Sequence, residues 1–114
     1  MTLRLTPDSL STMYEYLRTT RPFCTWGLPH ADEIGFHVVK NRAADADFIV
    51  INGVPTIRVS EHGVGQTDTL AATVGHEACH LRQHLKGWAL NHGARFQTMA
   101  KAVCKEHGFD SKTF

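Results

Sequence analysis

Two histidines and a glutamate form the arrangement in this chain that is best suited to chemistry. His76 and Glu77 are adjacent and His80 lies four residues after His76, so the run reads His-Glu-x-x-His. In a helix, residues four apart lie one turn apart on the same face, so both imidazoles can reach one metal ion. Glu77 would lie beside that ion and could take a proton from a water bound to it. The spacing predicts a catalytic zinc site with His76 and His80 as ligands and Glu77 as the general base.

A catalytic zinc ion takes three protein ligands and keeps its fourth position open, so the helical pair needs a third partner. We favour His92, because Gly87 is placed to end the helix and a short link can bring the next helix back toward the metal. The metzincin pattern is excluded. It needs glycine three and histidine six residues after His80, where Gln83 and Lys86 stand.

Glu106 is the alternative third ligand, in a Glu-x-x-x-Asp run of the kind that gluzincin peptidases use. Gly108 lies inside that run and weakens the helix that would carry both acids, but the assignment stays open. Cys79 falls on a different side of the helix from the histidine pair, so we expect a buried thiol there. His84 lies one turn beyond His80 and is expected at the surface or beside the ligands.

Length and composition indicate one ordinary globular domain covering residues 1–114. The hydrophobic fraction is 42%, the charged fraction 20% and the formal net charge +1, so no strong field indicates a nucleic-acid or membrane partner. Three cysteines without a Cys-x-x-Cys pair argue against a disulfide framework. The sequence has no apolar run of signal-peptide or membrane-spanning length, so we expect a cytoplasmic protein with no membrane partner.

The order of local patterns predicts an α+β domain. It would contain an N-terminal helix, a small three-stranded sheet with a hairpin, the helix of the His-Glu-x-x-His motif and a C-terminal helix. Thr6 and Pro7 begin the first helix as a hydroxyl cap and a first-turn proline, and Pro22 stops it. The alternating apolar residues at 34–38 predict the first strand.

The next two strands are predicted as a hairpin. Phe48–Ile51 is apolar and meets Asn52-Gly53, a strong hairpin signal, before a second β-rich run. Pro55 lies in that run and suits an edge strand, where a missing N–H does least harm. We therefore expect residues 56–60 to form the rim of the cleft, where an extended peptide could add by main-chain hydrogen bonds.

From Thr67 the apolar spacing becomes helical, and Gly87 closes this helix. The last helix is expected to open near Asn91 and to close at Gly108. The predicted buried stripes are Leu70, Val74, Ala78, Leu81 and Leu85 in the first of these helices, and Phe96, Met99, Ala100, Val103 and Cys104 in the second.

These motifs together resemble the SprT-like zinc metallopeptidases, the group that includes the Spartan DNA–protein crosslink proteases. The resemblance rests on HEACH at 76–80, HGARF at 92–96 and a final helix that runs into GFD at 108–110. It spans roughly residues 10 to 110. The upstream helix and short strands fit the same group more loosely.

The resemblance implies a minimal zincin-like domain in which His76, His80 and His92 bind zinc and Glu77 is the general base and acid. The implied activity is a zinc-dependent metalloendopeptidase that hydrolyses peptide bonds with metal-activated water, with DNA-associated or crosslinked proteins among its substrates. The alternatives are a gluzincin-type peptidase that uses Glu106 and a non-catalytic, zinc-stabilised module that binds DNA or protein. Glu77 argues against the module, because a structural site has no use for that carboxylate.

Any DNA association of this chain is expected to be weak. Relatives in the group often carry a cysteine zinc ribbon or another DNA-binding segment, and no such segment follows the last predicted helix in this sequence. The implied peptidase activity makes a protein or peptide substrate the expected partner.

Overall fold

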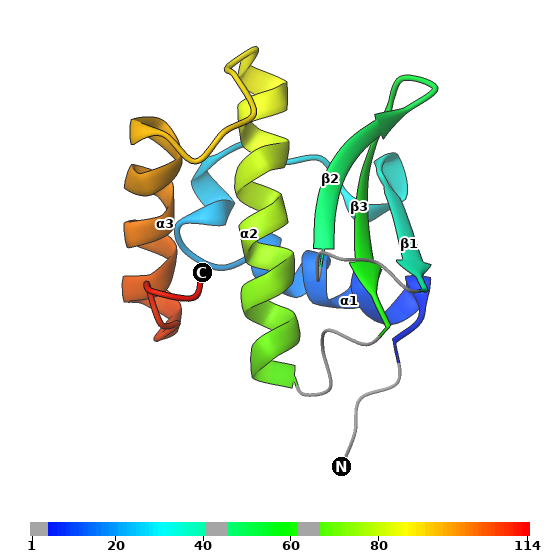
Figure 1. Cartoon of the computed structure of the whole chain (residues 1–114), viewed down its shortest axis with the longest axis horizontal. Coiled ribbons are helices and arrows are strands. Elements are labelled where there is room, and N and C mark those ends of the chain that lie inside the picture. The colour runs from blue at the N-terminus through cyan, green and yellow to red at the C-terminus, as the bar shows by residue number, and fades with distance from the viewer. Residues whose placement is uncertain (1–4, 41–45, 62–66) are drawn as a thin grey trace.

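The computed structural model describes residues 5–40, 46–61 and 67–114. Within these residues three α-helices and a three-stranded mixed sheet form an α+β fold, which confirms the predicted class (Figure 1). The elements are, in chain order, α1 (Pro7–Arg18), β1 (Gly35–Val39), β2 (Ala46–Ile51), β3 (Val54–Ser60), α2 (Thr67–Lys86) and α3 (Ala94–His107), with short 3-10 helices at Phe23–Thr25 and Ala31–Glu33.

Helix α1 begins as predicted and packs against the sheet. The Thr6 hydroxyl accepts a hydrogen bond from the backbone N–H of Ser9, so one of the unpaired donors at the helix start is satisfied. Tyr14 is buried on this helix, its ring lies 5.6 Å from that of Phe36 in β1, and its hydroxyl donates to the carbonyl of Pro29. These contacts fix α1 across the sheet.

The sheet has the order β1-β3-β2, so the expectation of an edge strand at Pro55 was wrong. Asn52 and Gly53 both have positive φ and join β2 to β3 as the predicted hairpin. Strand β3 then runs parallel to β1 and occupies the centre. Pro55 is tolerated because the pairing with β1 begins only at Thr56, so the missing N–H lies outside that ladder.

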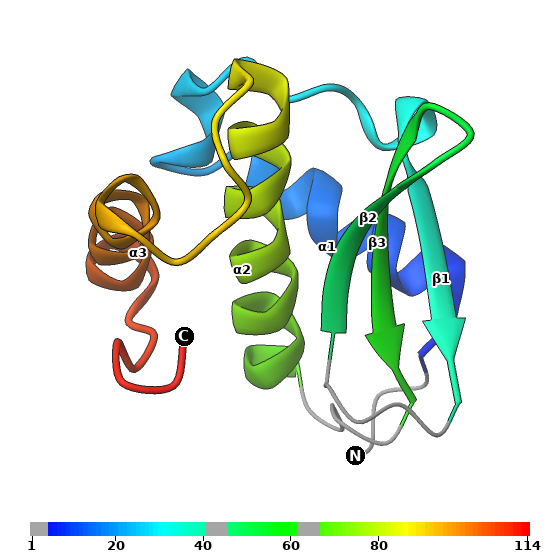
Figure 2. The ribbon, with the colours of Figure 1, turned by 45° about the horizontal axis from the view of Figure 1, so that its top comes forward.

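The two C-terminal helices form a layer beside the sheet. Figure 2 shows α2 next to β2, with α3 on the opposite side of α2. The predicted buried residues of both helices are confirmed except Leu85, which is 47% exposed because the last turn of α2, at residues 84–86, projects into solvent. Gly87 and Gly108 follow the helix ends with φ of +72° and +74°, a conformation that favours glycine.

The link between α2 and α3 is longer than the sequence suggested. Helix α3 begins at Ala94 rather than near Asn91, because the Asn91 side chain accepts a hydrogen bond from the N–H of Gly93 and holds these residues in a turn. His92 therefore lies in a loop before the helix. In the described part of the chain, no helix is long and apolar enough to cross a membrane.

Candidate metal centre

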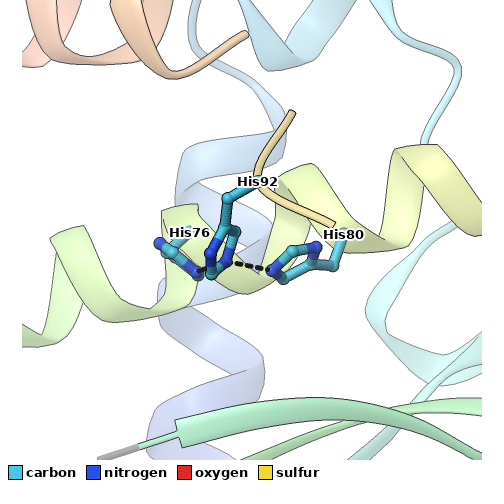
Figure 3. A group of neighbouring side chains, drawn as sticks. All are labelled: His76, His80 and His92. Atoms are coloured by element: carbon cyan, nitrogen blue, oxygen red, sulfur yellow. Dashed lines mark hydrogen bonds between the residues drawn. The ribbon is translucent and has the colours of Figure 1, made fainter. Parts of the chain in front are cut away.

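Three imidazoles converge where the loop before α3 passes α2. Figure 3 shows His76 and His80 on α2 facing His92 from the loop. The Nε2 atom of His92 lies 3.2 Å from Nε2 of His76 and 3.1 Å from Nε2 of His80. The structure thus brings together the pair of the motif and the third histidine that the sequence favoured.

This separation fits a metal ion. Nitrogen ligands around a tetrahedral zinc ion, at bonds of about 2.0–2.1 Å, lie roughly 3.3 Å apart. The His76, His80 and His92 ligand atoms all lie within 4.8 Å of one another, so one ion could contact all three. Imidazole nitrogens suit zinc and several other transition metals, and the donor set therefore fits the predicted ion.

Burial keeps the two helical imidazoles neutral, as a metal ligand must be. Loss of hydration lowers the pKa of His76 to about 4, with smaller effects from His80 and His92. Burial also lowers the pKa of His80, although a hydrogen bond to Gln83 acts in the opposite direction. At neutral pH neither ring needs to lose a proton before it binds a cation.

Two partners of these rings were missed by the sequence reasoning. The buried side chain of Gln83 lies with Oε1 2.7 Å from Nδ1 of His80, and the ring of Phe114 lies 5.4 Å from the ring of His76. Gln83 lies three residues after His80 and hence on the same face of α2, a signal that could have identified it. Phe114 is remote in sequence from the motif, so only the tertiary fold shows its role.

Phe96 forms the aromatic floor of the site. Its ring, 2% exposed, lies 4.8 Å from the ring of His76, 4.9 Å from that of His80 and 4.7 Å from that of His92. Phe96 lies in the first turn of α3, so the packing of α3 on α2 places His92 beside the other two histidines. The hydrophobic contact and the ligand geometry are therefore coupled.

Glu77 lies beside the ligands but is not one of the three converging groups. The residue is only 5% exposed. Burial raises its pKa to about 8, and the nearby charge of Asp47 on β2 adds to this effect. A carboxyl group with so little hydration is a candidate acid or base rather than a structural charge.

A cavity of about 660 Å³ opens next to His76 and Glu77. Its wall is built from the first half of α2, the start of β2 and the C-terminal segment. The remaining lining residues are Ala46, Thr69, Ala72, Thr73, His107, Gly108, Phe109, Asp110, Thr113 and Phe114. One of the three converging histidines, His76, and the buried carboxyl group of Glu77 are thus reached from one space.

The other candidate ligands lie elsewhere. Glu106 is exposed in the last turn of α3, outside the group that the structure brings together. Cys79 is fully buried, as expected, and burial raises the pKa of its thiol. His84 is exposed, with its ring 5.8 Å from that of Phe48.

The predicted cleft rim at residues 56–60 was wrong. These residues lie in β3, which pairs with β1 on one side and β2 on the other and so has no free edge for an added strand. Strand β2 is the edge nearest α2 (Figure 2).

The chain matches no known family model, no curated protein and no solved structure.

Proposed function

We propose that this protein is a zinc-dependent metallopeptidase with a minimal zincin-like domain of the SprT-like type. One observation carries the proposal: three imidazole nitrogens converge beside a buried carboxylate, and both His76 and Glu77 line the same cavity. Three protein ligands leave one position of a tetrahedral ion for water or substrate, as in catalytic rather than structural zinc sites.

In this proposal His76, His80 and His92 hold the zinc ion and Glu77 moves the proton. When bound, zinc supplies Lewis acidity, which activates water near neutral pH and polarises a carbonyl. The Glu77 carboxylate accepts a proton from the attacking water and then delivers it to the leaving amine. Burial favours the protonated form of Glu77, while a nearby cation favours the charged form, so the same group can serve in both steps.

The substrate of the proposed enzyme is a protein or peptide. Thr69 and Thr73 provide hydroxyl groups on the cavity wall, while Phe109 and Phe114 provide apolar surface, a mixture suited to a peptide side chain and its backbone. The edge strand β2 lies beside α2 and offers a place for an extended segment to pair. The SprT-like resemblance adds DNA-associated or crosslinked proteins as a proposed substrate class.

The two alternatives have less support from the geometry. A non-catalytic, zinc-stabilised module would favour four protein ligands and has no role for a buried Glu77 that opens onto a cavity. A gluzincin-type peptidase would need Glu106 at the metal, and this side chain is exposed at the end of α3.

A peptidase assay with the substitution Glu77→Gln tests the proposal. We expect the zinc-loaded parent protein to cleave unfolded casein. The variant should retain its zinc and lose activity by roughly 10²–10⁴-fold, the usual contribution of a general acid–base group. Glu106→Gln, which removes an exposed carboxylate, should cleave at the parental rate. A parent protein that holds one zinc ion and cleaves nothing would favour the binding module, and a fully active Glu77→Gln variant would exclude the proposed base.

A further inference from the structure

Gln83 is a buried polar side chain that joins the two parts of the candidate metal centre. It is 1% exposed and lies on α2 three residues after His80. Its Oε1 atom lies 2.7 Å from Nδ1 of His80, and its Nε2 atom donates to the carbonyl of Asn91 over 2.9 Å. A buried amide that satisfies both of its ends in this way is held in one orientation.

The carbonyl of Asn91 determines that orientation. A carbonyl oxygen can only accept a hydrogen bond, so the NH₂ end of Gln83 must face Asn91 and the oxygen end must face His80. An amide oxygen likewise only accepts, so Nδ1 of His80 carries the ring proton. The lone pair of the neutral ring is then on Nε2, the atom that faces His92.

The same amide also holds the loop that carries the third histidine. Asn91 directly precedes His92, and its side chain accepts a hydrogen bond from the N–H of Gly93. His92 itself is exposed, so little burial fixes its position. The bond from Gln83 to the Asn91 carbonyl therefore ties this loop to α2 at the level of His80.

We propose that Gln83 is a positioning residue of the metal centre. It sets the tautomer of His80 so that Nε2 is ready to bind the ion, and it fixes the loop that places His92 opposite. The inference rests on one part of the proposed function, the binding of a metal ion by the three histidines. Outer partners of this kind typically change metal affinity by about 10–100-fold when they are removed.

Two substitutions separate the two roles of Gln83. Gln83→Met keeps the length of the side chain and removes both hydrogen bonds. Gln83→Glu keeps an acceptor for Nδ1 of His80, but a carboxylate cannot donate to the carbonyl of Asn91. Lys101→Met is the control, because it also introduces a methionine but at an exposed position of α3.

The first measurement is the tautomer of His80 in the metal-free protein, from the side-chain nitrogen and carbon shifts in NMR. We expect the Nδ1–H form in the parent, in Gln83→Glu and in Lys101→Met, and a mixture with the Nε2–H form in Gln83→Met. The Nε2–H form in the parent protein would overturn the proposal, whatever the variants do. A purely structural role for Gln83 would change stability and leave this tautomer unmoved.

The second measurement is zinc affinity, by competition with a chromophoric chelator. Gln83→Met should bind zinc about 10–100-fold more weakly than the parent, Gln83→Glu should weaken binding by a smaller factor, and Lys101→Met should bind nearly as tightly as the parent. A folded Gln83→Met protein with parental affinity and an unchanged tautomer would refute the positioning role. A parent that binds zinc but cleaves no peptide would contradict the proposed function alone, since neither measurement uses hydrolysis.

Discussion

At the scale of single residues, the imidazoles of the candidate metal centre are held by neighbouring side chains. Gln83 accepts from His80 and ties the loop of His92 through the carbonyl of Asn91, and the ring of Phe114 lies 5.4 Å from that of His76. These contacts fix the rings before any ion arrives, so less ordering is needed when a metal binds. The carboxyl group of Glu77 is also buried, and burial makes its charged form less favourable than it would be in water.

Replacement of Glu77 should make the metal-free protein more stable at alkaline pH. The folded-state pKa of about 8 is higher than the ordinary value of 4.5, so the folded protein binds a proton in this interval that the unfolded chain has lost. Stability from this group is therefore present below pH 4.5 and is lost as pH rises toward 8. Glu77→Gln removes this pH-dependent loss of stability. The unfolding free energy of the variant minus that of the parent should therefore increase between pH 6.5 and 8, by up to about 2 kcal/mol.

Urea unfolding in the presence of a chelator measures this difference. The interval above pH 6.5 is chosen because the pKa values of His76 and His80 are lowered from 6.5, so those groups affect stability mainly at more acidic pH. Glu106→Gln, at an exposed position, should show no such growth. A Glu77→Gln advantage that is constant from pH 6.5 to 8 would show that the Glu77 pKa is not raised.

At the scale of elements, the contact between α2 and α3 holds the candidate site together. Phe96 is buried and touches all three imidazole rings. Phe96→Ala should cost about 3–5 kcal/mol of unfolding free energy in the metal-free protein, because a large ring is lost from a packed interior. It should also weaken zinc binding, since α3 would no longer place His92.

Unfolding and zinc competition on the same samples test this coupling. Lys101→Ala, at an exposed position of α3, serves as the control and should change both quantities little. A Phe96→Ala protein that stays folded and binds zinc as tightly as the parent would show that the docking of α3 and the geometry of the ligands are independent.

The local elements could be predicted from the sequence because their signals lie within a few residues. The cap at Thr6, the Asn52-Gly53 turn and the glycine that ends each C-terminal helix act on their neighbours, and the structure confirms each of them. The central place of β3 could not be predicted this way. It depends on parallel pairing with β1 across about twenty residues of chain, which the composition of β3 does not encode.

The same contrast holds at the candidate site. The spacing of His76 and His80 requires only one helix, and the return of His92 requires only a helix end and a short link. The sequence identifies Gln83 only as a residue that does not fit the metzincin pattern. Its role depends on the carbonyl of Asn91 coming back to α2, and such a contact follows from the tertiary fold rather than from spacing.

At the scale of the whole molecule, the formal net charge is only +1, and this limits what the protein can bind by electrostatics. We predict weak DNA binding, with a dissociation constant near the non-specific range of about 10⁻⁴–10⁻⁶ M at physiological salt. Few phosphate contacts should also give a shallow dependence on salt. Titration of single- and double-stranded oligonucleotides at several salt concentrations measures both properties, and nanomolar affinity for either would show a concentrated basic surface that the overall charge conceals.

The identity of the metal ligands is the central claim, and a crystal structure of the zinc-loaded protein with anomalous data at the zinc edge tests it most directly. The proposal predicts a single zinc ion with Nε2 of His76, His80 and His92 at about 2.0–2.1 Å and a non-protein fourth ligand on the side of Glu77. A zinc ion bound by Glu106 in place of His92, or by a fourth protein ligand that closes the site, would contradict it.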